Sequence, residues 1–221
     1  MTRDLTLLKD GAAELGISLG DAELERFSRF ADELAKWNRK INLTAITESR
    51  EVVLKHFLDS LTVAARIHLA GRVLDIGSGA GFPGIPLAIV RPDLDIVSVD
   101  AVEKKIMFQR HAARTLGLAN FKALHARGEA LPDLYGSYFD IIVSRAFADL
   151  VNFAKMVLPL LADGGVIVAM KGSEGKREAV THGQELTELG VRVESVQEFG
   201  LPGAGDRRSI IMLRNKIDEH D

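Results

Sequence analysis

Apolar side chains recur with a helical period in the first third of the chain. They return every three or four positions, which places them on one face of a helix while charged residues take the other face. This pattern predicts helices over about residues 3–16, 21–40 and 48–67. The clearest stripe, in the second of these helices, is expected to serve packing and contains Leu24, Phe27, Phe30 (or Ala31), Leu34 and Trp37.

The pattern changes at Gly71, after which short apolar runs alternate with helical stretches. Such runs are typical of strands buried in a parallel sheet. The last two predicted strands, 191–199 and 207–214, follow each other without a helix, so they can pair as an antiparallel hairpin. We therefore expect an α/β, Rossmann-like domain over residues 71–221, with a mostly parallel seven-stranded sheet and an antiparallel last strand. A helical extension over residues 1–70 would pack on it.

Composition narrows the class of protein without identifying its ligand. The 221 residues are 47% hydrophobic and 27% charged, as in ordinary globular proteins. The absence of cysteine excludes disulfides and thiolate metal sites, and the six histidines show no pair at metal-ligand spacing, so we expect no metal. No uncharged apolar run approaches the roughly 18 residues of a membrane span. We expect a soluble cytoplasmic protein, and its net charge of −3 means that any RNA binding must use a local basic face.

A glycine-rich turn follows the first predicted strand, Val73–Ile76. Glycines at 77, 79 and 81 remove the side chains that would keep a ligand away from the backbone, and they permit positive φ where the chain reverses. The two prolines that follow are tolerated only in the first turn of a helix, which predicts a helix over residues 84–90. The turn is therefore expected to hold a small molecule.

Two classes of cofactor bind to such a turn. Gly79, Gly81 and Gly84 match the dinucleotide pattern G-x-G-x-x-G, which is weak evidence alone. Counted from Gly77, the first glycine after the strand, the spacing is instead D-x-G-x-G-x-G with Asp75, which resembles the first motif of S-adenosylmethionine-dependent methyltransferases. The terminal hairpin also favours a methyltransferase, because an NAD domain would continue with a helical crossover. An NAD-dependent oxidoreductase and a turn without a ligand stay open as alternatives.

Charged residues at the ends of later strands extend the candidate site. Asp100 follows Gly77 by 23 residues, the separation at which an acid can accept hydrogen bonds from both ribose hydroxyls, although it can equally cap the next helix. The loop 127–129 follows the third strand, at the edge of the sheet where a base would lie. Arg145 and Lys171 end two further strands, and a charged side chain at that position rarely serves core packing.

Several uncommon segments occur together along nearly the whole chain. They are Trp37-Asn38, Asn42-Leu43-Thr44, His56 with Asp59-Ser60, Asp75 to Leu87, Arg91-Pro92, Arg127-x-Glu129, Ser144 to Phe147, Lys171-Gly172 and Arg207. Together they resemble the bacterial small-subunit ribosomal RNA guanine-N7 methyltransferases, also called glucose-inhibited division protein B. The run Gly-Phe-Pro-Gly-Ile-Pro from residue 81 is far rarer than any generic methyltransferase motif.

The resemblance implies a class I methyltransferase that uses S-adenosyl-L-methionine to methylate N7 of one guanine near the decoding site of 16S rRNA. Its partner would be 16S rRNA or the small ribosomal subunit. It also implies cofactor contacts at Gly77, Phe82, Gly128, Glu129 and Arg145. The chain departs from the family at Gly128, where relatives often have a larger residue. If the cofactor contact is made through the backbone, this difference should weaken the contact little.

The chemistry requires alignment rather than a catalytic base. N7 of guanine has an in-plane lone pair and no proton, so what remains is orientation of nucleophile, methyl carbon and sulfur. We assign no catalytic base, and take Arg145 and Lys171 as positioning candidates. The predicted cofactor-binding residues are Gly77, Gly79, Phe82, Asp100, Gly128, Glu129 and Arg145. The candidates for substrate or RNA contacts are Asn42, His56, Lys171 and Arg207.

Three alternatives to these assignments stay open. His56 could be an ordinary solvated or core histidine. The enzyme could act on another RNA position or on a small molecule, because a fold does not determine its substrate. The fold could also serve as a non-catalytic RNA-binding module. We expect a monomer, since no apolar helix face is left over.

Overall fold

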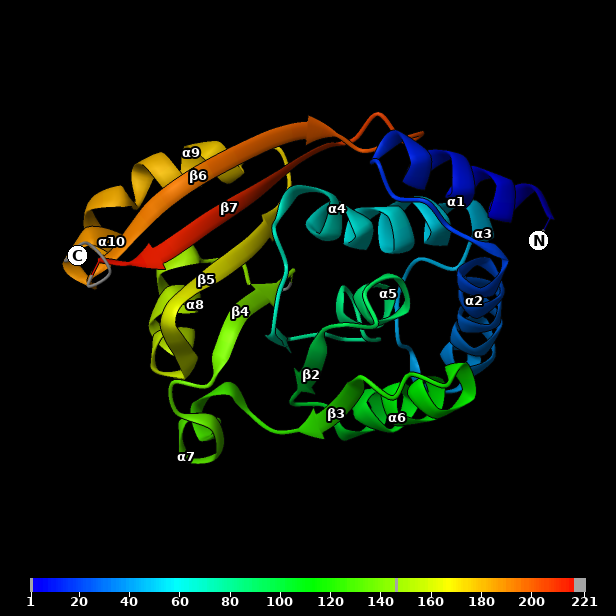
Figure 1. Ribbon diagram of the computed structural model, residues 1–221, viewed down its shortest axis with the longest axis horizontal. Coiled ribbons are helices and arrows are strands. Elements are labelled where there is room, and N and C mark those ends of the chain that lie inside the picture. Colours follow the sequence, from blue (N-terminus) through cyan, green and yellow to red (C-terminus); the bar gives the residue numbers. More distant parts are fainter. Residues whose placement is uncertain (1, 146, 217–221) are drawn as a thin grey trace.

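The computed structural model describes residues 2–145 and 147–216, and a sheet of seven strands forms the centre of this part (Figure 1). The strands are β1 (Arg72–Ile76), β2 (Asp95–Asp100), β3 (Phe121–His125), β4 (Phe139–Ser144), β5 (Leu161–Lys171), β6 (Val191–Gly200) and β7 (Arg207–Asn215). Their order is β3-β2-β1-β4-β5-β7-β6, and β7 runs antiparallel to both of its neighbours. The predicted fold class is confirmed. The last strand does not lie at the end of the sheet, however, because it inserts between β5 and β6.

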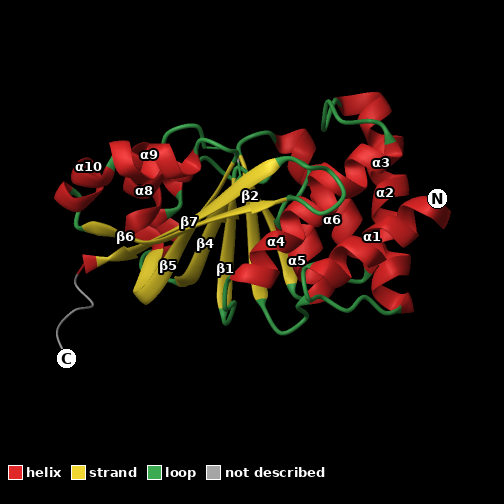
Figure 2. Cartoon of the chain, turned by 90° about the horizontal axis from the view of Figure 1, so that it is seen from above, coloured by secondary structure: helices red, strands yellow, loops and turns green. Residues whose placement is uncertain are grey.

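Helices cover both faces of the sheet. They are α1 (Thr2–Glu14), α2 (Asp21–Ile41), α3 (Ser49–Val52), α4 (Asp59–Arg66), α5 (Gly84–Val90), α6 (Glu103–Leu116), α7 (Pro132–Tyr135), α8 (Leu150–Val157), α9 (Gly175–Thr181) and α10 (Gly183–Glu188). Figure 2 shows α8, α9 and α10 on one side of the strands and α1 to α6 on the other. None of the helices in this described part is both long and apolar enough to cross a membrane.

Two of the predicted helices are interrupted. The helix expected over 48–67 consists of α3 and α4 joined by a π-helical turn, Val53–Leu58. The helical stretch between β5 and β6 is divided into α9 and α10 at His182, directly before Gly183. Glycine is a poor residue for a helix interior, which accounts for the second interruption. Periodicity alone did not indicate either break.

Successive side chains of the central strands belong alternately to two separate buried clusters. In β1, Val73 belongs to the cluster on the α5 side, while its neighbour Leu74 belongs to the cluster on the α8 side. Successive side chains of a strand point to opposite faces, so continuous apolar runs are required where both faces are covered. This is the arrangement that the short apolar runs predicted.

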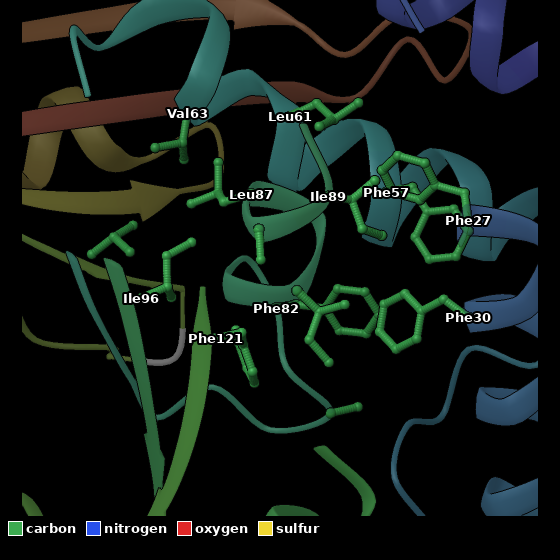
Figure 3. Close-up of a cluster of buried hydrophobic side chains, with 14 of the residues drawn as sticks. Phe27, Phe30, Phe57, Leu61, Val63, Phe82, Leu87, Ile89, Ile96 and Phe121 are labelled. Carbon is green, nitrogen blue, oxygen red and sulfur yellow. The ribbon is translucent and has the colours of Figure 1, made fainter. Parts of the chain in front are cut away.

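Aromatic rings join the N-terminal helices to the glycine turn (Figure 3). Phe30 of α2 lies 5.3 Å from Phe82 of the turn, measured between ring centroids, and Phe57 of the π-helical turn lies 5.6 Å from Phe30. All three rings are buried in the cluster that also contains Ile96 of β2. The N-terminal helices therefore share a core with the sheet. The predicted domain boundary at residue 70 stays a prediction.

Candidate functional site

The glycine turn after β1 has the backbone conformation expected of it. Gly77, Gly79 and Gly81 have φ values of 71°, 59° and 91°. A Cβ atom on Gly79 would meet no other atom within 4 Å, so this glycine faces open space. A Cβ on Gly81 would overlap the side chain of Ile85. Gly79 thus leaves room for a ligand, whereas Gly81 allows close packing of the helix that follows.

Asp75 supports the turn from inside the protein. Its carboxylate is fully buried, and Oδ2 accepts a hydrogen bond of 2.8 Å from the backbone N–H of Gly84, at the start of α5. Oδ1 has no hydrogen-bond partner among the described residues. Burial raises the pKa of Asp75 to about 7, because the charged form loses its hydration. The acid of the D-x-G-x-G-x-G motif therefore fastens the helix to the strand.

Three neighbouring cavities lie along the carboxyl ends of the strands. The Asp100 cavity, about 300 Å³, is lined in part by Gly77, Asp100, Gly128, Glu129 and Met156. The His56 cavity, about 230 Å³, is lined in part by Leu43, Thr44, His56, Gly77, Gly79, Phe82 and Arg145. The Arg208 cavity, about 360 Å³, is lined in part by Lys55, His56, Asp59, Arg145, Lys171 and Arg208. The seven predicted cofactor-binding residues all line the first two cavities, which meet at Gly77.

Asp100 contributes its carboxylate to the first cavity and also holds the backbone around it. Oδ2 accepts a hydrogen bond of 2.9 Å from the N–H of Gly79, and Oδ1 accepts one of 2.8 Å from the N–H of Val102, which precedes α6. Each carboxylate oxygen has a further lone pair. Both interpretations of Asp100, as a ligand contact and as a residue that caps the next helix, are compatible with this geometry.

Gly128 lies in the same cavity, against the side chain of Met156. A Cβ on Gly128 would overlap Met156 Sδ and would come within 3.3 Å of Ile76 Cδ1. The sulfur atom therefore occupies the space that a larger residue at 128 would need. Gly128 and Met156 therefore fit together, and only a larger residue at 128 would require Met156 to move. The expectation that this departure from the family has little effect on the cofactor contact stays a prediction.

His56 is a buried residue whose two ring nitrogens both have partners. Nδ1 lies 3.3 Å from Nη2 of Arg145, and Nε2 lies 2.9 Å from Oγ1 of Thr44. A guanidinium can only donate, so Nδ1 must accept, and the ring proton is on Nε2. Burial and the positive charge of Arg145 lower the pKa of His56 to about 3, which keeps the ring neutral. The ring stacks on Phe82 at 4.4 Å between centroids.

Arg145 lies between the His56 cavity and the Arg208 cavity. Its Nη1 donates to the carbonyl of Lys55 at 3.1 Å and to Oδ2 of Asp59 at 3.4 Å. The π-helical turn makes the first bond possible, since the N–H of Asp59 bonds to the carbonyls of Leu54 and His56 and bypasses that of Lys55. Wide turns of this type occur often at functional sites.

Sequence reasoning overlooked one arginine of this site. Arg208 donates from Nε to Oδ1 of Asp59 at 2.9 Å, so the buried Asp59 carboxylate lies between two guanidinium groups. The chosen candidate, Arg207, is exposed at the surface next to it. Strand alternation shows that the two side chains point to opposite faces, but only the three-dimensional register shows which face borders the cavity.

Lys171 and Asn42 have structural partners. The ammonium of Lys171 donates to the carbonyls of Phe147 and Ala148, at 2.8 and 3.0 Å, and to Glu178 Oε1 at 2.8 Å, which uses its three protons. Asn42 has a φ of 49° and ends α2, where its N–H bonds to the carbonyl of Asn38. Their assignment as substrate contacts stays untested.

Comparison with known proteins places the chain in a family. The family model described as rRNA small subunit methyltransferase G matches residues 23–211. The protein named ribosomal RNA small subunit methyltransferase G from Geobacter metallireducens is 55% identical over 210 residues, which are 95% of this chain and 96% of the relative. The protein of that name from Geobacter sulfurreducens is 54% identical, over 96% of this chain and 97% of the relative.

Solved structures support the fold. A SAM-dependent methyltransferase from Aquifex aeolicus superimposes with a TM-score of 0.56 at 18% identity, over 71% of this chain and 90% of its own. A putative S-adenosyl-L-methionine-dependent methyltransferase from Methanococcus maripaludis has a TM-score of 0.55 at 19% identity, over 82% and 90% of the two chains. The predicted fold and family are confirmed, and the chain belongs to the rRNA small subunit methyltransferase G family.

Proposed function

We propose that this chain transfers the methyl group of S-adenosyl-L-methionine to N7 of a guanine in 16S rRNA. One observation carries the proposal: in a member of this family, the seven predicted cofactor residues line two cavities that meet at Gly77. The named relatives act on small-subunit rRNA, which supplies the class of substrate.

The residues of the two cavities fit an adenosine-containing cofactor with an amino-acid end. The open space at Gly79 is the room that such a molecule needs beside the turn. Asp100 would accept hydrogen bonds from the ribose hydroxyls, and Gly128 and Glu129 would contact the adenine. Phe82 and Arg145 would enclose the opposite end. When bound, the cofactor supplies an electrophilic methyl group on a sulfonium.

The groups around Arg145 suit a nucleophile that has no proton to lose. The two nitrogens of His56 are engaged, and its ring is neutral. Asp59 is bound between two arginines. Among the described residues that surround Arg145, these carboxylate and imidazole groups are therefore not free to act as a general base. N7 of guanine needs none, and the protein's contribution is to align the reactants.

RNA binding would use local positive charge. Arg207 is exposed beside the Arg208 cavity, and Lys55 lines that cavity with about a third of its side chain exposed. Because the chain as a whole is acidic, such groups rather than bulk charge would attract phosphate. Lys171, with its protons engaged, would position the loop at Phe147–Ala148. We expect a monomer that works in the cytoplasm, where the small ribosomal subunit is assembled.

The test is methyl transfer from labelled S-adenosyl-L-methionine to small ribosomal subunits that lack the modification. The modified base is mapped by strand scission at N7-methylguanine. A single scission site at a guanine of the decoding region is the expected result. Cofactor binding without transfer to subunits or to free 16S rRNA would overturn the substrate and leave the cofactor assignment in place.

A further inference from the structure

The hydroxyl of Thr44 can donate its proton but has little capacity left to accept one. Oγ1 accepts a hydrogen bond of 2.9 Å from Nε2–H of His56 and another of 3.0 Å from the backbone N–H of Ile46. A hydroxyl has two lone pairs and one proton, so both lone pairs are engaged. The remaining interaction of Thr44 is donation to an acceptor.

The position of Thr44 is fixed on both sides of its backbone. Oδ1 of Asn38 accepts from the N–H of Thr44 at 2.9 Å, and Nδ2 of Asn38 donates to its carbonyl at 2.9 Å. The direction of the His56 bond is fixed as well, because Arg145 must donate to Nδ1. With a pKa of about 3, His56 keeps this arrangement throughout the neutral range. Thr44 is therefore a preorganised donor.

Thr44 lines two cavities, one of about 670 Å³ beside α2 and the His56 cavity. Since Arg145 and the glycine turn line only the second of these two, we place the acceptor in the His56 cavity. This cavity continues into the Asp100 cavity at Gly77. A nucleoside in the Asp100 cavity with a long substituent on its 5′ carbon would extend past Gly77 into the His56 cavity. In the proposed cofactor, that substituent is the amino-acid end.

Charge decides which part of the amino-acid end Thr44 meets. An ammonium group can only donate hydrogen bonds, whereas a carboxylate can only accept them. Among the described residues that line the His56 cavity, Arg145 supplies a positive charge and none supplies a negative one. A carboxylate therefore matches both the free proton of Thr44 and the charge of its surroundings.

We propose that Thr44 donates a hydrogen bond to the α-carboxylate of the cofactor's methionine moiety, beside the guanidinium of Arg145. The N-terminal part of the chain then contributes to recognition of the amino-acid end, together with Phe82 and Arg145, whereas the Asp100 cavity, which recognises the adenosine, is lined by residues after Gly71. This inference rests on the proposed function, because it assumes the same cofactor in the same two cavities.

The test compares two ligands on the full chain by titration calorimetry. S-adenosylhomocysteine has the amino-acid end, and 5′-methylthioadenosine lacks it. Thr44→Val should raise the Kd for S-adenosylhomocysteine roughly 10- to 100-fold, as expected for loss of a hydrogen bond to a charged group. The Kd for methylthioadenosine should be unchanged. Equal loss of affinity for both ligands, or no loss for either, would overturn the proposal.

Two matched variants control for folding and for position. Thr44→Ser keeps the hydroxyl and should bind both ligands like the wild type; weak binding of S-adenosylhomocysteine alone by this variant would contradict the proposal. Asp100→Asn changes the other cavity and should raise the Kd for both ligands by the same factor. Decarboxylated S-adenosylhomocysteine, which lacks only the carboxylate, should bind equally to the wild type and to Thr44→Val.

The outcomes separate this inference from the proposed function. If the wild-type chain binds neither ligand, the cofactor assignment itself fails. If the wild type binds S-adenosylhomocysteine and Thr44→Val binds it equally well, only the role of Thr44 fails. A variant with normal ligand binding and slow methyl transfer would assign Thr44 to the guanine instead and would also overturn the inference.

Discussion

The Asp100 cavity and the His56 cavity share Gly77, yet they are built in different ways. The described lining of the first comes from residues 76–156, at the carboxyl ends of parallel strands. The second joins residues 43–56 of the N-terminal part to the glycine turn and Arg145. Parallel sheets commonly bind nucleosides at this edge, so the first cavity follows from the fold. The second depends on side chains that the N-terminal part supplies, namely Leu43, Thr44 and His56.

The free energy of unfolding should be more sensitive to mutation in the side-chain network behind the His56 cavity than at an exposed ion pair. Asp59→Ala leaves the guanidinium groups of Arg145 and Arg208 without their shared carboxylate, which is 7% exposed. Breaking a buried ion pair in this way costs about 3–5 kcal/mol of unfolding free energy. Urea denaturation measures it. Asp93→Ala, which removes an exposed pair with Arg91, is the control and should cost at most about 1 kcal/mol. Equal costs would contradict the comparison.

Arg145 belongs to the second cavity, and its loss should abolish most activity. Arg145→Ala removes the donor to His56 and the positive charge beside the proposed carboxylate, so we expect turnover to fall roughly 100-fold, in line with loss of a well-placed charged donor. Labelled methyl transfer at saturating substrates measures it, with a thermal melt to verify folding. Arg145→Lys keeps the charge without the planar fork and should be intermediate. Undiminished turnover by Arg145→Ala would refute the assignment.

Asp75 lies beneath the turn that both cavities share, and it should make stability depend on pH. Its folded pKa of about 7 exceeds the ordinary aspartate pKa of 3.8, so the folded state binds more protons than the unfolded state between these pH values. Its contribution to stability is therefore present at low pH and is lost as pH rises through 7. Relative to Asp75→Asn, the wild type should lose about 2–3 kcal/mol between pH 5 and pH 8. Urea titrations at both pH values measure the free energy of unfolding of the two proteins. An equal change in the wild type and in Asp75→Asn between pH 5 and pH 8 would disprove the prediction.

Arg207 lines neither of the two cofactor cavities and should have the smallest effect. Arg207→Gln should leave cofactor binding and the melting temperature unchanged. If Arg207 contacts one phosphate, the slope of log K for RNA against log salt should decrease by about one. Filter binding at several salt concentrations measures the slope. An unchanged slope would remove Arg207 from the RNA contacts, and a loss of cofactor binding would mean that the two cavities extend farther than described.

Much of the fold was predictable because burial imposes a period on the sequence. Helix α5 was expected at 84–90 and occurs at Gly84–Val90, since glycine and proline restrict where a helix can begin. The terminal hairpin was expected from the absence of a helix between its strands. The π-helical turn at Val53–Leu58 was not, because residues 52–54 and 56–63 are all buried, so the segment has no narrow apolar stripe whose shift would reveal an inserted residue.

The candidate site was predictable only in part. Gly77 and Gly79 lie in the turn after β1, and Asp100 is the last residue of the neighbouring strand β2, so topology alone brings them together. The hydrogen bonds of Thr44 to His56 and of Asp59 to Arg208 join positions 12 and 149 residues apart. Whether such side chains meet depends on helix packing, strand register and rotamers, and periodicity contains none of these.

The place of β7 in the sheet determines when β6 can pair during synthesis of the chain. Among the strands of the described residues, β6 pairs with β7 alone, although β6 is synthesised first. On the ribosome, residues 191–200 have no strand to pair with until residues 207–215 have emerged. Arg208 arrives on that same last strand. A chain translated only as far as residue 206 therefore lacks both this edge of the sheet and one wall of the site, so methylation can begin only after residues 207–215 have been made.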